Sequence, residues 1–129
     1  AEIFAEETEV GFRDREEAAL VQVAKRPTHV IALGGGTILR EANRNIIAGS
    51  GWGVWLDAEP EILVARLAGD ETTADDQSVF DEVQSVMTKR EPLYRASANL
   101  RVNTSHRTMD EILAEVLKAL PSSIGRAPN

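Results

Sequence analysis

The feature that most constrains the fold is an apolar run, residues 30–33, that ends in three consecutive glycines, Gly34, Gly35 and Gly36. A short apolar run of this kind is typical of a strand buried in a parallel sheet. Because glycine has no Cβ, the backbone N–H groups of the triplet can come close to a polar small molecule. The sequence therefore predicts a buried strand over residues 28–33 that ends at a ligand-facing turn, although glycine clusters commonly mark only a tight turn.

The composition restricts the chain to one small acidic domain. Its 129 residues, 43% of them hydrophobic, suffice for a single core. A net charge of −7 argues against a nucleic-acid surface, and the absence of cysteine excludes disulfides and thiolate metal sites. No apolar run approaches the roughly 20 residues that span a bilayer, and a cytoplasmic location fits these features. Since the sequence begins at Ala1 inside an expected helix, we expect a fragment.

Helix-like and strand-like patterns alternate along the chain, which predicts an α/β fold with a parallel sheet and right-handed crossovers. Further strands are expected over residues 52–56 and 100–103. Pro60 suits the first turn of a helix. The other expected segments are the end of a helix in residues 1–9, helices over 10–25, 40–48, 79–98 and 110–120, a loop over 71–78 and a flexible tail over 121–129.

Two arginines have positions that suit anion binding. Arg13 lies three residues before Glu16, so the carboxylate can hold the guanidinium for a bidentate grip on a carboxylate or phosphate. Arg95 lies near the end of a long expected helix. A surface ion pair and relief of the helix dipole explain each arginine equally well when it is taken alone. Asp57, at an expected strand end, is interpreted as a turn or cap residue rather than a metal ligand.

Taken together, several ordered motifs resemble the shikimate kinase family over residues 1–120. The most diagnostic of them is KREPLYR, which ends at Arg95. The others are IFAEETE (3–9) with Phe12, Arg13 and Glu16, VIALGGG (30–36) with Asn43 and Arg44, WLDAEPE (55–61) with RLA (66–68), and RVNT (101–104).

The resemblance implies an enzyme of aromatic amino-acid biosynthesis that transfers the γ-phosphoryl group of ATP to the 3-hydroxyl of shikimate. By resemblance, Arg13 and Arg95 would hold the carboxylate of shikimate. Gly34, Gly35 and Gly36 would supply backbone donors to the ring hydroxyls. The pair of arginines suits a ring carboxylate, which argues against another kinase of the same class, such as a gluconate-type enzyme.

The resemblance also implies two cofactors, ATP and Mg²⁺. Arg66 would pack on adenine, and Arg107 would border the nucleotide. Both cofactors would be bound mainly outside these 129 residues, which contain no Gly-x-x-x-x-Gly-Lys-Ser/Thr loop and hence no phosphate-loop lysine. No catalytic residue and no metal ligand is therefore assigned within the chain. The resemblance implies a monomer when the protein is complete.

The implied fold is a three-layer parallel sheet of the P-loop kinase type, of which the chain would hold the third, fourth and fifth strands with their helices. The family's strand order is 2-3-1-4-5, so the first strand, which lies at the centre, would be missing. Unpaired strand edges and an uncovered core would follow. We therefore expect residues 1–120, a partial domain, to be poorly stable and inactive alone.

The lid segment departs from the family pattern. Residues 72–78 run directly into Val79 and Phe80, without the arginine–proline pair that family members carry there. A transition-state arginine in related reactions contributes on the order of 10³–10⁵ in rate. This departure leaves open an alternative function, a non-catalytic kinase-like domain that binds a small molecule.

Overall fold

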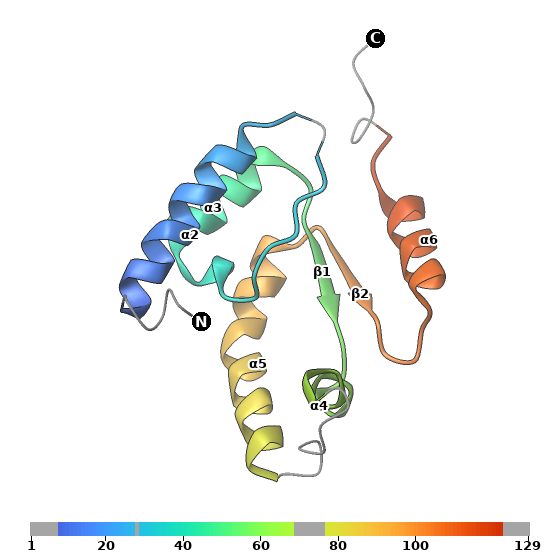
Figure 1. The fold of residues 1–129 in the computed structure, drawn as a ribbon. Coiled ribbons are helices and arrows are strands. Elements are labelled where there is room, and N and C mark those ends of the chain that lie inside the picture. Colours follow the sequence, from blue (N-terminus) through green and yellow to red (C-terminus); the bar gives the residue numbers. More distant parts are fainter. Residues whose placement is uncertain (1–7, 28, 69–76, 123–129) are drawn as a thin grey trace. The chain divides into compact units, whose positions relative to one another are not determined.

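The computed structural model describes most of the chain, namely residues 8–27, 29–68 and 77–122. The helix end expected over residues 1–9 lies outside the described residues as far as residue 7, as does the tail from Ser123 onward; the last residue of that expected helix end, Glu9, instead begins the next helix. The chain divides into two compact units, both drawn in Figure 1. The first runs to Gly53 and takes in residues 121–129, of which Pro121 and Ser122 are described, and the second is residues 54–120.

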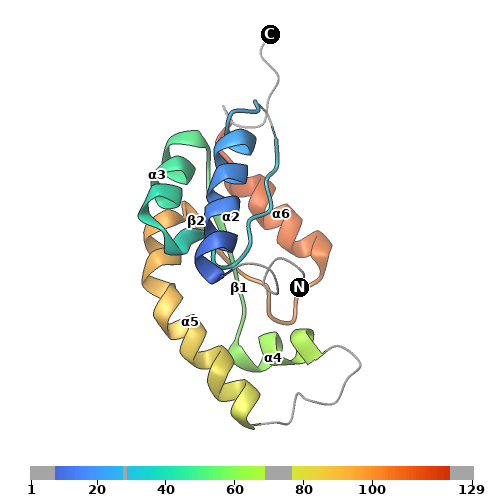
Figure 2. The ribbon, with the colours of Figure 1, turned by 60° about the vertical axis from the view of Figure 1, so that its left-hand side comes forward.

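The first unit consists of two helices and one short 3-10 helix. α2 (Glu9–Ala24) is capped by Thr8, whose hydroxyl oxygen accepts a hydrogen bond from the Gly11 N–H at 3.2 Å. α3 (Glu41–Ser50) lies beside α2, as Figure 2 shows, and η1 (Thr37–Leu39) contacts both helices. Both helices confirm the pattern-based predictions to within two residues at each end.

Arg40 links the two helices of this unit. Its Nη1 donates to Asp14 Oδ1 at 2.8 Å and to Glu17 Oε1 at 3.4 Å, both on α2. The hydrogen bond to Asp14 raises the pKa of the Arg40 guanidinium, a group that is charged at every ordinary pH in any case. The apolar core beneath is small, since among the described residues of this unit only Leu20 and Ile38 are buried apolar side chains.

The strand predicted over residues 28–33 is wrong for its described part. Residues 29–33 form no regular secondary structure, and Val30 is fully exposed rather than buried. A strand needs a neighbour that supplies the other half of a hydrogen-bond ladder, and no described segment pairs with this one. The apolar pattern expresses a preference for burial, but pairing decides whether a strand forms.

The second unit is built around two parallel strands. β1 (Val54–Asp57) pairs in parallel with β2 (Leu100–Asn103), with Val54 opposite Leu100. The two helices α4 (Pro60–Ala68) and α5 (Gln77–Ser97) connect them, and α6 (Met109–Ala119) follows and packs on β2. Figures 1 and 2 both show α5 and α6 on opposite sides of the strand pair.

These elements confirm most of the prediction for this half of the chain. β2 has the predicted bounds, and α4 begins at Pro60 as predicted. β1 begins two residues later than predicted. The predicted loop over residues 71–78 is wrong at its end, because Gln77 and Ser78 already belong to α5; residues 71–76 lie outside the described part.

Few apolar side chains of the second unit are buried. Val102, Val64 and Ala58 form its described core, with Val102 fully inaccessible. Leu56 and Leu67, by contrast, are largely exposed, and on α6 Leu113 and Leu117 are more than half exposed. The described residues of this unit therefore leave much of their apolar surface exposed, and the low stability expected from the sequence stays a prediction.

A capping box fixes the start of α6. The Thr108 hydroxyl accepts from the Glu111 N–H, and Glu111 Oε1 accepts from the Thr108 N–H, both at 3.1 Å. The hydrogen bond from the Thr108 backbone holds the pKa of the Glu111 carboxyl below its ordinary value of 4.5. A carboxyl with a lowered pKa stabilises the folded state above its ordinary pKa, and this stabilisation is lost as the pH falls through the lower folded value.

We expect Glu111→Gln to lower the thermal unfolding midpoint at pH 7, and we expect this effect to shrink as the pH falls and the parent carboxyl takes up its proton. Circular dichroism melts between pH 3 and pH 7 measure the difference. Glu82→Gln, which removes a carboxylate from the exposed surface of α5, is the matched control and should leave the unfolding midpoint at pH 7 close to that of the parent. A difference of the same size at pH 3 and pH 7 would contradict the proposed role of the charge.

Candidate functional site

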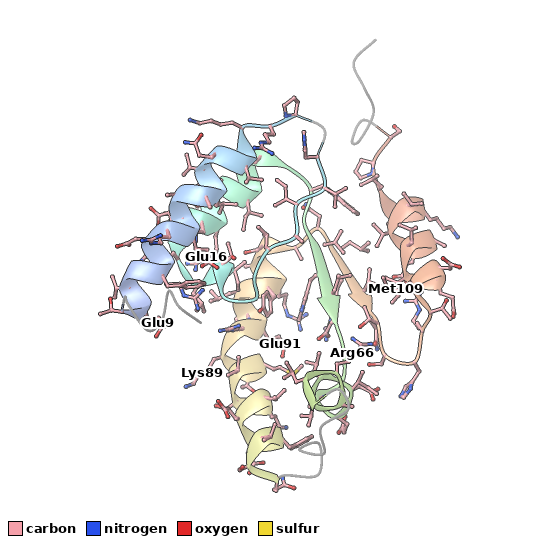
Figure 3. The ribbon with its side chains drawn as sticks, viewed as in Figure 1. Glu9, Glu16, Arg66, Lys89, Glu91 and Met109 are labelled. Carbon is pink, nitrogen blue, oxygen red and sulfur yellow. The ribbon has the colours of Figure 1, made fainter. Side chains whose placement is uncertain are left out.

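An ion pair on α2 forms the base of the first candidate site. The Arg13 Nη1 donates to Glu16 Oε1 at 2.9 Å, and each of the two side chains is only 16% exposed. This confirms the pairing that the three-residue spacing predicts. The guanidinium also lies 3.8 Å from Glu9 and over the ring of Phe12 at 5.2 Å. Figure 3 labels Glu9 and Glu16 where they project from α2.

Glu16 also connects α2 to the segment after the glycines. Its second oxygen, Oε2, accepts from the hydroxyl of Thr37 at 3.0 Å. The Thr37 carbonyl in turn accepts from Asn43 Nδ2 at 2.9 Å, and both Thr37 and Asn43 are buried. One carboxylate therefore holds Arg13 on one side and the start of η1 on the other. Sequence reasoning did not assign Thr37 or Asn43 to the site.

The Arg13 guanidinium lies directly against the glycine turn. A Cβ at Gly36 would come within 2.5–2.7 Å of three guanidinium atoms of Arg13, closer than real Cβ contacts allow. A Cβ at Gly34 would meet only ordinary contacts, 3.4 Å from Glu16 and 3.6 Å from Thr37. The backbone of Gly36 is right-handed, with φ −92°, so this position needs glycine for the close approach and not for its conformation.

Arg13 retains hydrogen-bonding capacity. Its Nε is buried and has no hydrogen-bond partner among the described residues. In the described contacts, only one of its nitrogens, Nη1, donates a hydrogen bond, and the acceptor is Glu16. The 3.8 Å separation between Nη2 and Glu9 is too long for a hydrogen bond. A planar guanidinium held from one side and with donors to spare can bind a carboxylate or phosphate in two-point fashion.

In the second unit, the two arginines predicted to bind the nucleotide both donate hydrogen bonds to the turn that follows β2. Arg66, in the last turn of α4, donates to Thr104 Oγ1 at 2.9 Å and to the Thr104 carbonyl at 3.0 Å. Arg107 donates to the carbonyl of Asn103 at 2.9 Å. Figure 3 shows Arg66 projecting from α4. The structure thus brings both arginines to the turn that follows β2.

Arg95 occupies a different part of the second unit. It forms an ion pair with Glu91, one turn earlier on α5, and its guanidinium lies 5.9 Å from the centre of the Trp55 ring. The ring of Trp55 also stacks on Tyr94, with 5.7 Å between the ring centres. Arg95 is 61% exposed at the side chain and so remains accessible to an anion.

Asp57 is the last residue of β1, and its two carboxylate oxygens bind different partners. Its Oδ1 accepts from the N–H of Ala58 at 2.9 Å, and its Oδ2 forms an ion pair with Arg101. Arg101 also covers the ring of Trp55, at 4.4 Å from the ring centre. Within residues 8–27, 29–68 and 77–122, no three His, Cys, Asp or Glu side chains gather as a metal site would require.

Comparison with known proteins agrees with the sequence resemblance. A sequence model of shikimate kinase matches residues 1–121. The chain belongs to the shikimate kinase family. It is 80% identical to a shikimate kinase of Rhodopirellula baltica, over 98% of this chain and 71% of that protein. It is 35% identical to the shikimate kinase of Symbiobacterium thermophilum, over 93% of this chain and 71% of that protein.

Solved structures of the family have the same fold. The shikimate kinase of Acinetobacter baumannii, solved in complex with shikimate, superposes with a TM-score of 0.81 at 29% identity, and the match covers 90% of this chain and 66% of that one. The enzyme of Bacteroides thetaiotaomicron gives 0.75 at 27% identity, over 91% and 70%. The chain therefore spans about two thirds of the length of these relatives.

The comparisons confirm the predicted family and fold class, and they support shikimate kinase, a phosphotransferase, over the alternative of a non-catalytic binding domain. The departure in the lid, residues 72–78, falls almost entirely outside the described residues. In the described part of the chain, no helix is both long and apolar enough to cross a membrane. The predicted roles of the individual site residues remain predictions.

Proposed function

We propose that this protein transfers the γ-phosphoryl group of ATP to the 3-hydroxyl of shikimate, with Arg13 and the glycine turn at the shikimate end. The observation that carries the proposal is the contact between Arg13 and Gly36. The guanidinium of Arg13 occupies the space that a Cβ of Gly36 would need, and Glu16 holds it there, so a cation lies directly beside the glycine turn. Shikimate offers the matching groups, one carboxylate and three ring hydroxyls.

In this proposal the chain acts mainly by orienting shikimate. Arg13 and Arg95 bind the carboxylate, and backbone N–H groups of Gly34, Gly35 and Gly36 bind ring hydroxyls. Phosphoryl transfer needs the attacking oxygen in line with the phosphorus, and correct positioning supplies much of the rate. Glu16 contributes by holding the guanidinium of Arg13 in one orientation, so that little side-chain entropy is lost when shikimate binds.

In the second unit, Arg66 and Arg107 would bind ATP. The described residues fit this role, because a guanidinium fixed in one plane can stack on an aromatic ring, and Arg66 has two acceptors that fix its plane. When bound, ATP supplies the phosphoryl group, and Mg²⁺ neutralises its charge. The described residues gather no ligand cluster for Mg²⁺. We further propose a cytoplasmic monomer, whose mass gel filtration would test.

Shikimate-dependent release of ADP by the full-length protein tests the proposal. Turnover above the blank without shikimate is the expected result. A folded protein with an intact phosphate-binding loop and no turnover would contradict it. Titration calorimetry with shikimate then separates the remaining possibilities, because a non-catalytic binding domain would still bind shikimate, whereas a kinase for a different substrate would not.

A further inference from the structure

We propose that Thr104 is a positioning residue for the nucleotide end of the reaction, because it fixes the plane of the Arg66 guanidinium. The inference rests on the proposed role of Arg66 toward ATP. Thr104 is the first residue after β2 and is only 6% exposed. Arg66 comes from α4, 38 positions earlier in the chain.

Two acceptors of Thr104 bind two different nitrogens of Arg66. The hydroxyl oxygen accepts from Nη1 at 2.9 Å, and the carbonyl oxygen accepts from Nη2 at 3.0 Å. One hydrogen bond would leave the guanidinium free to rotate about it. Two bonds from one rigid residue to the two outer nitrogens set the orientation of the whole plane, which decides whether a flat ring can stack on it.

The hydroxyl of Thr104 is itself locked as an acceptor toward Arg66. It donates its proton to the carbonyl of Asp57 at 2.8 Å, and the Thr104 N–H donates to the same carbonyl at 2.7 Å. With its one proton committed to the end of β1, the hydroxyl presents only lone pairs to Nη1. The carbonyl of Asp57, the side chain of Thr104 and the guanidinium of Arg66 thus form one part-buried chain of hydrogen bonds.

The partners of Arg66 are neutral, which distinguishes it from its neighbours. Arg95, Arg101 and Arg107 each form an ion pair with a carboxylate. In the described part of the chain, Arg66 donates to two neutral oxygens and has no carboxylate within ion-pair distance. Among the described residues, neutral acceptors alone fix its orientation. A guanidinium held by neutral acceptors keeps its full positive charge, which favours cation–π stacking on an aromatic ring.

The test is a double-mutant cycle on the full-length protein. Thr104→Val keeps the shape and removes the hydroxyl, Thr104→Ser keeps the hydroxyl, and Arg66→Met removes the guanidinium. We measure kcat, the KM for each substrate and the Kd for ADP by calorimetry. Loss of a hydrogen bond to a charged group predicts a rise of about tenfold in the KM for ATP and the Kd for ADP with Thr104→Val. The kcat and the KM for shikimate should stay within about twofold.

Two further results are expected from the same set of variants. Thr104→Ser should restore the KM for ATP to within about twofold of the parent. In the Arg66→Met background, Thr104→Val should add less than about a twofold change, because a residue that acts only through Arg66 has nothing left to orient. If Thr104→Val does not fold, as judged by circular dichroism, Thr104→Ala replaces it in the same cycle.

The possible failures are distinguishable. If Arg66→Met leaves the KM for ATP and the Kd for ADP unchanged, the proposed role of Arg66 is wrong, and the inference about Thr104 fails with it. If Arg66→Met weakens ATP binding and Thr104→Val does not, Arg66 keeps its role and only the positioning inference is overturned. An equal effect of Thr104→Val with and without Arg66 overturns it as well, since Thr104 then acts independently.

Discussion

Arg13→Met should lower kcat/KM for shikimate by about 100- to 1,000-fold, while the protein remains folded. Removing one partner from a buried, charge-assisted pair with a carboxylate costs about 2–5 kcal/mol of binding, and each 1.4 kcal/mol is tenfold. The side chain of Arg13 is largely buried, so little water screens the interaction. Most of the loss should fall on the KM for shikimate, because the carboxylate is bound equally in the ground and transition states. Steady-state kinetics with shikimate as the varied substrate measure it.

Two variants sharpen this test. Arg13→Lys keeps the charge and loses the planar fork of donors, so it should recover only part of the activity. Arg26→Met is the matched control, because Arg26 is an exposed arginine just beyond the end of α2; it should behave as the parent does. An Arg13→Met enzyme whose KM for shikimate stays within about twofold of the parent would remove Arg13 from the substrate site.

Gly36→Ala should lower kcat/KM for shikimate by about 100-fold at almost no cost in stability. The backbone at this position tolerates alanine, but its Cβ would overlap the guanidinium of Arg13, which lies 2.5–2.7 Å away. Since the guanidinium is the far end of a flexible side chain, it moves and the fold survives. A displacement of about 1 Å at a substrate-positioning group can cost on the order of 100-fold in rate.

Gly34, the first glycine of the same turn, provides the control for this prediction. Gly34→Ala introduces the same methyl group into the same turn, where its nearest contacts lie at 3.4 Å and 3.6 Å. Because this methyl group leaves Arg13 in place, the loss of kcat/KM for shikimate should be clearly smaller than with Gly36→Ala. Thermal melts of both variants show whether the fold is kept. Equal losses of activity in Gly34→Ala and Gly36→Ala would show that the turn responds to any methyl group, and not to the displacement of Arg13.

The sequence predicts most of the helices and the positions of the strands β1 and β2, because those patterns are local. Apolar periodicity places α5 and α6 to within two residues, and Pro60 marks the first residue of α4. The strand predicted at residues 28–33 shows the limit of such patterns. Its apolar residues indicate that the segment prefers to be buried. No pattern within the segment indicates whether a partner strand lies beside it.

The contacts of the candidate site also fall into two groups: local contacts, which the sequence predicts, and long-range contacts, which it does not. The pairing of Arg13 with Glu16 follows from spacing on one helix. The bond from Thr37 to Glu16 joins residues 21 apart, and that from Arg66 to Thr104 joins residues 38 apart. A threonine after three glycines and a threonine after a short strand carry no local signal of these contacts. Only the folded chain reveals that each threonine orients a charged side chain.

The parallel pairing of β1 and β2 has a consequence for the order of folding. The bond between Thr104 and Asp57 joins residues 47 apart, so it closes a long loop and carries a large entropic cost until α4 and α5 are in place. During synthesis, β1, α4 and α5 all leave the ribosome before the turn that holds Arg66. The nucleotide end of the site should therefore be among the last parts to form, and substitutions at Thr104 should speed unfolding more than they slow folding.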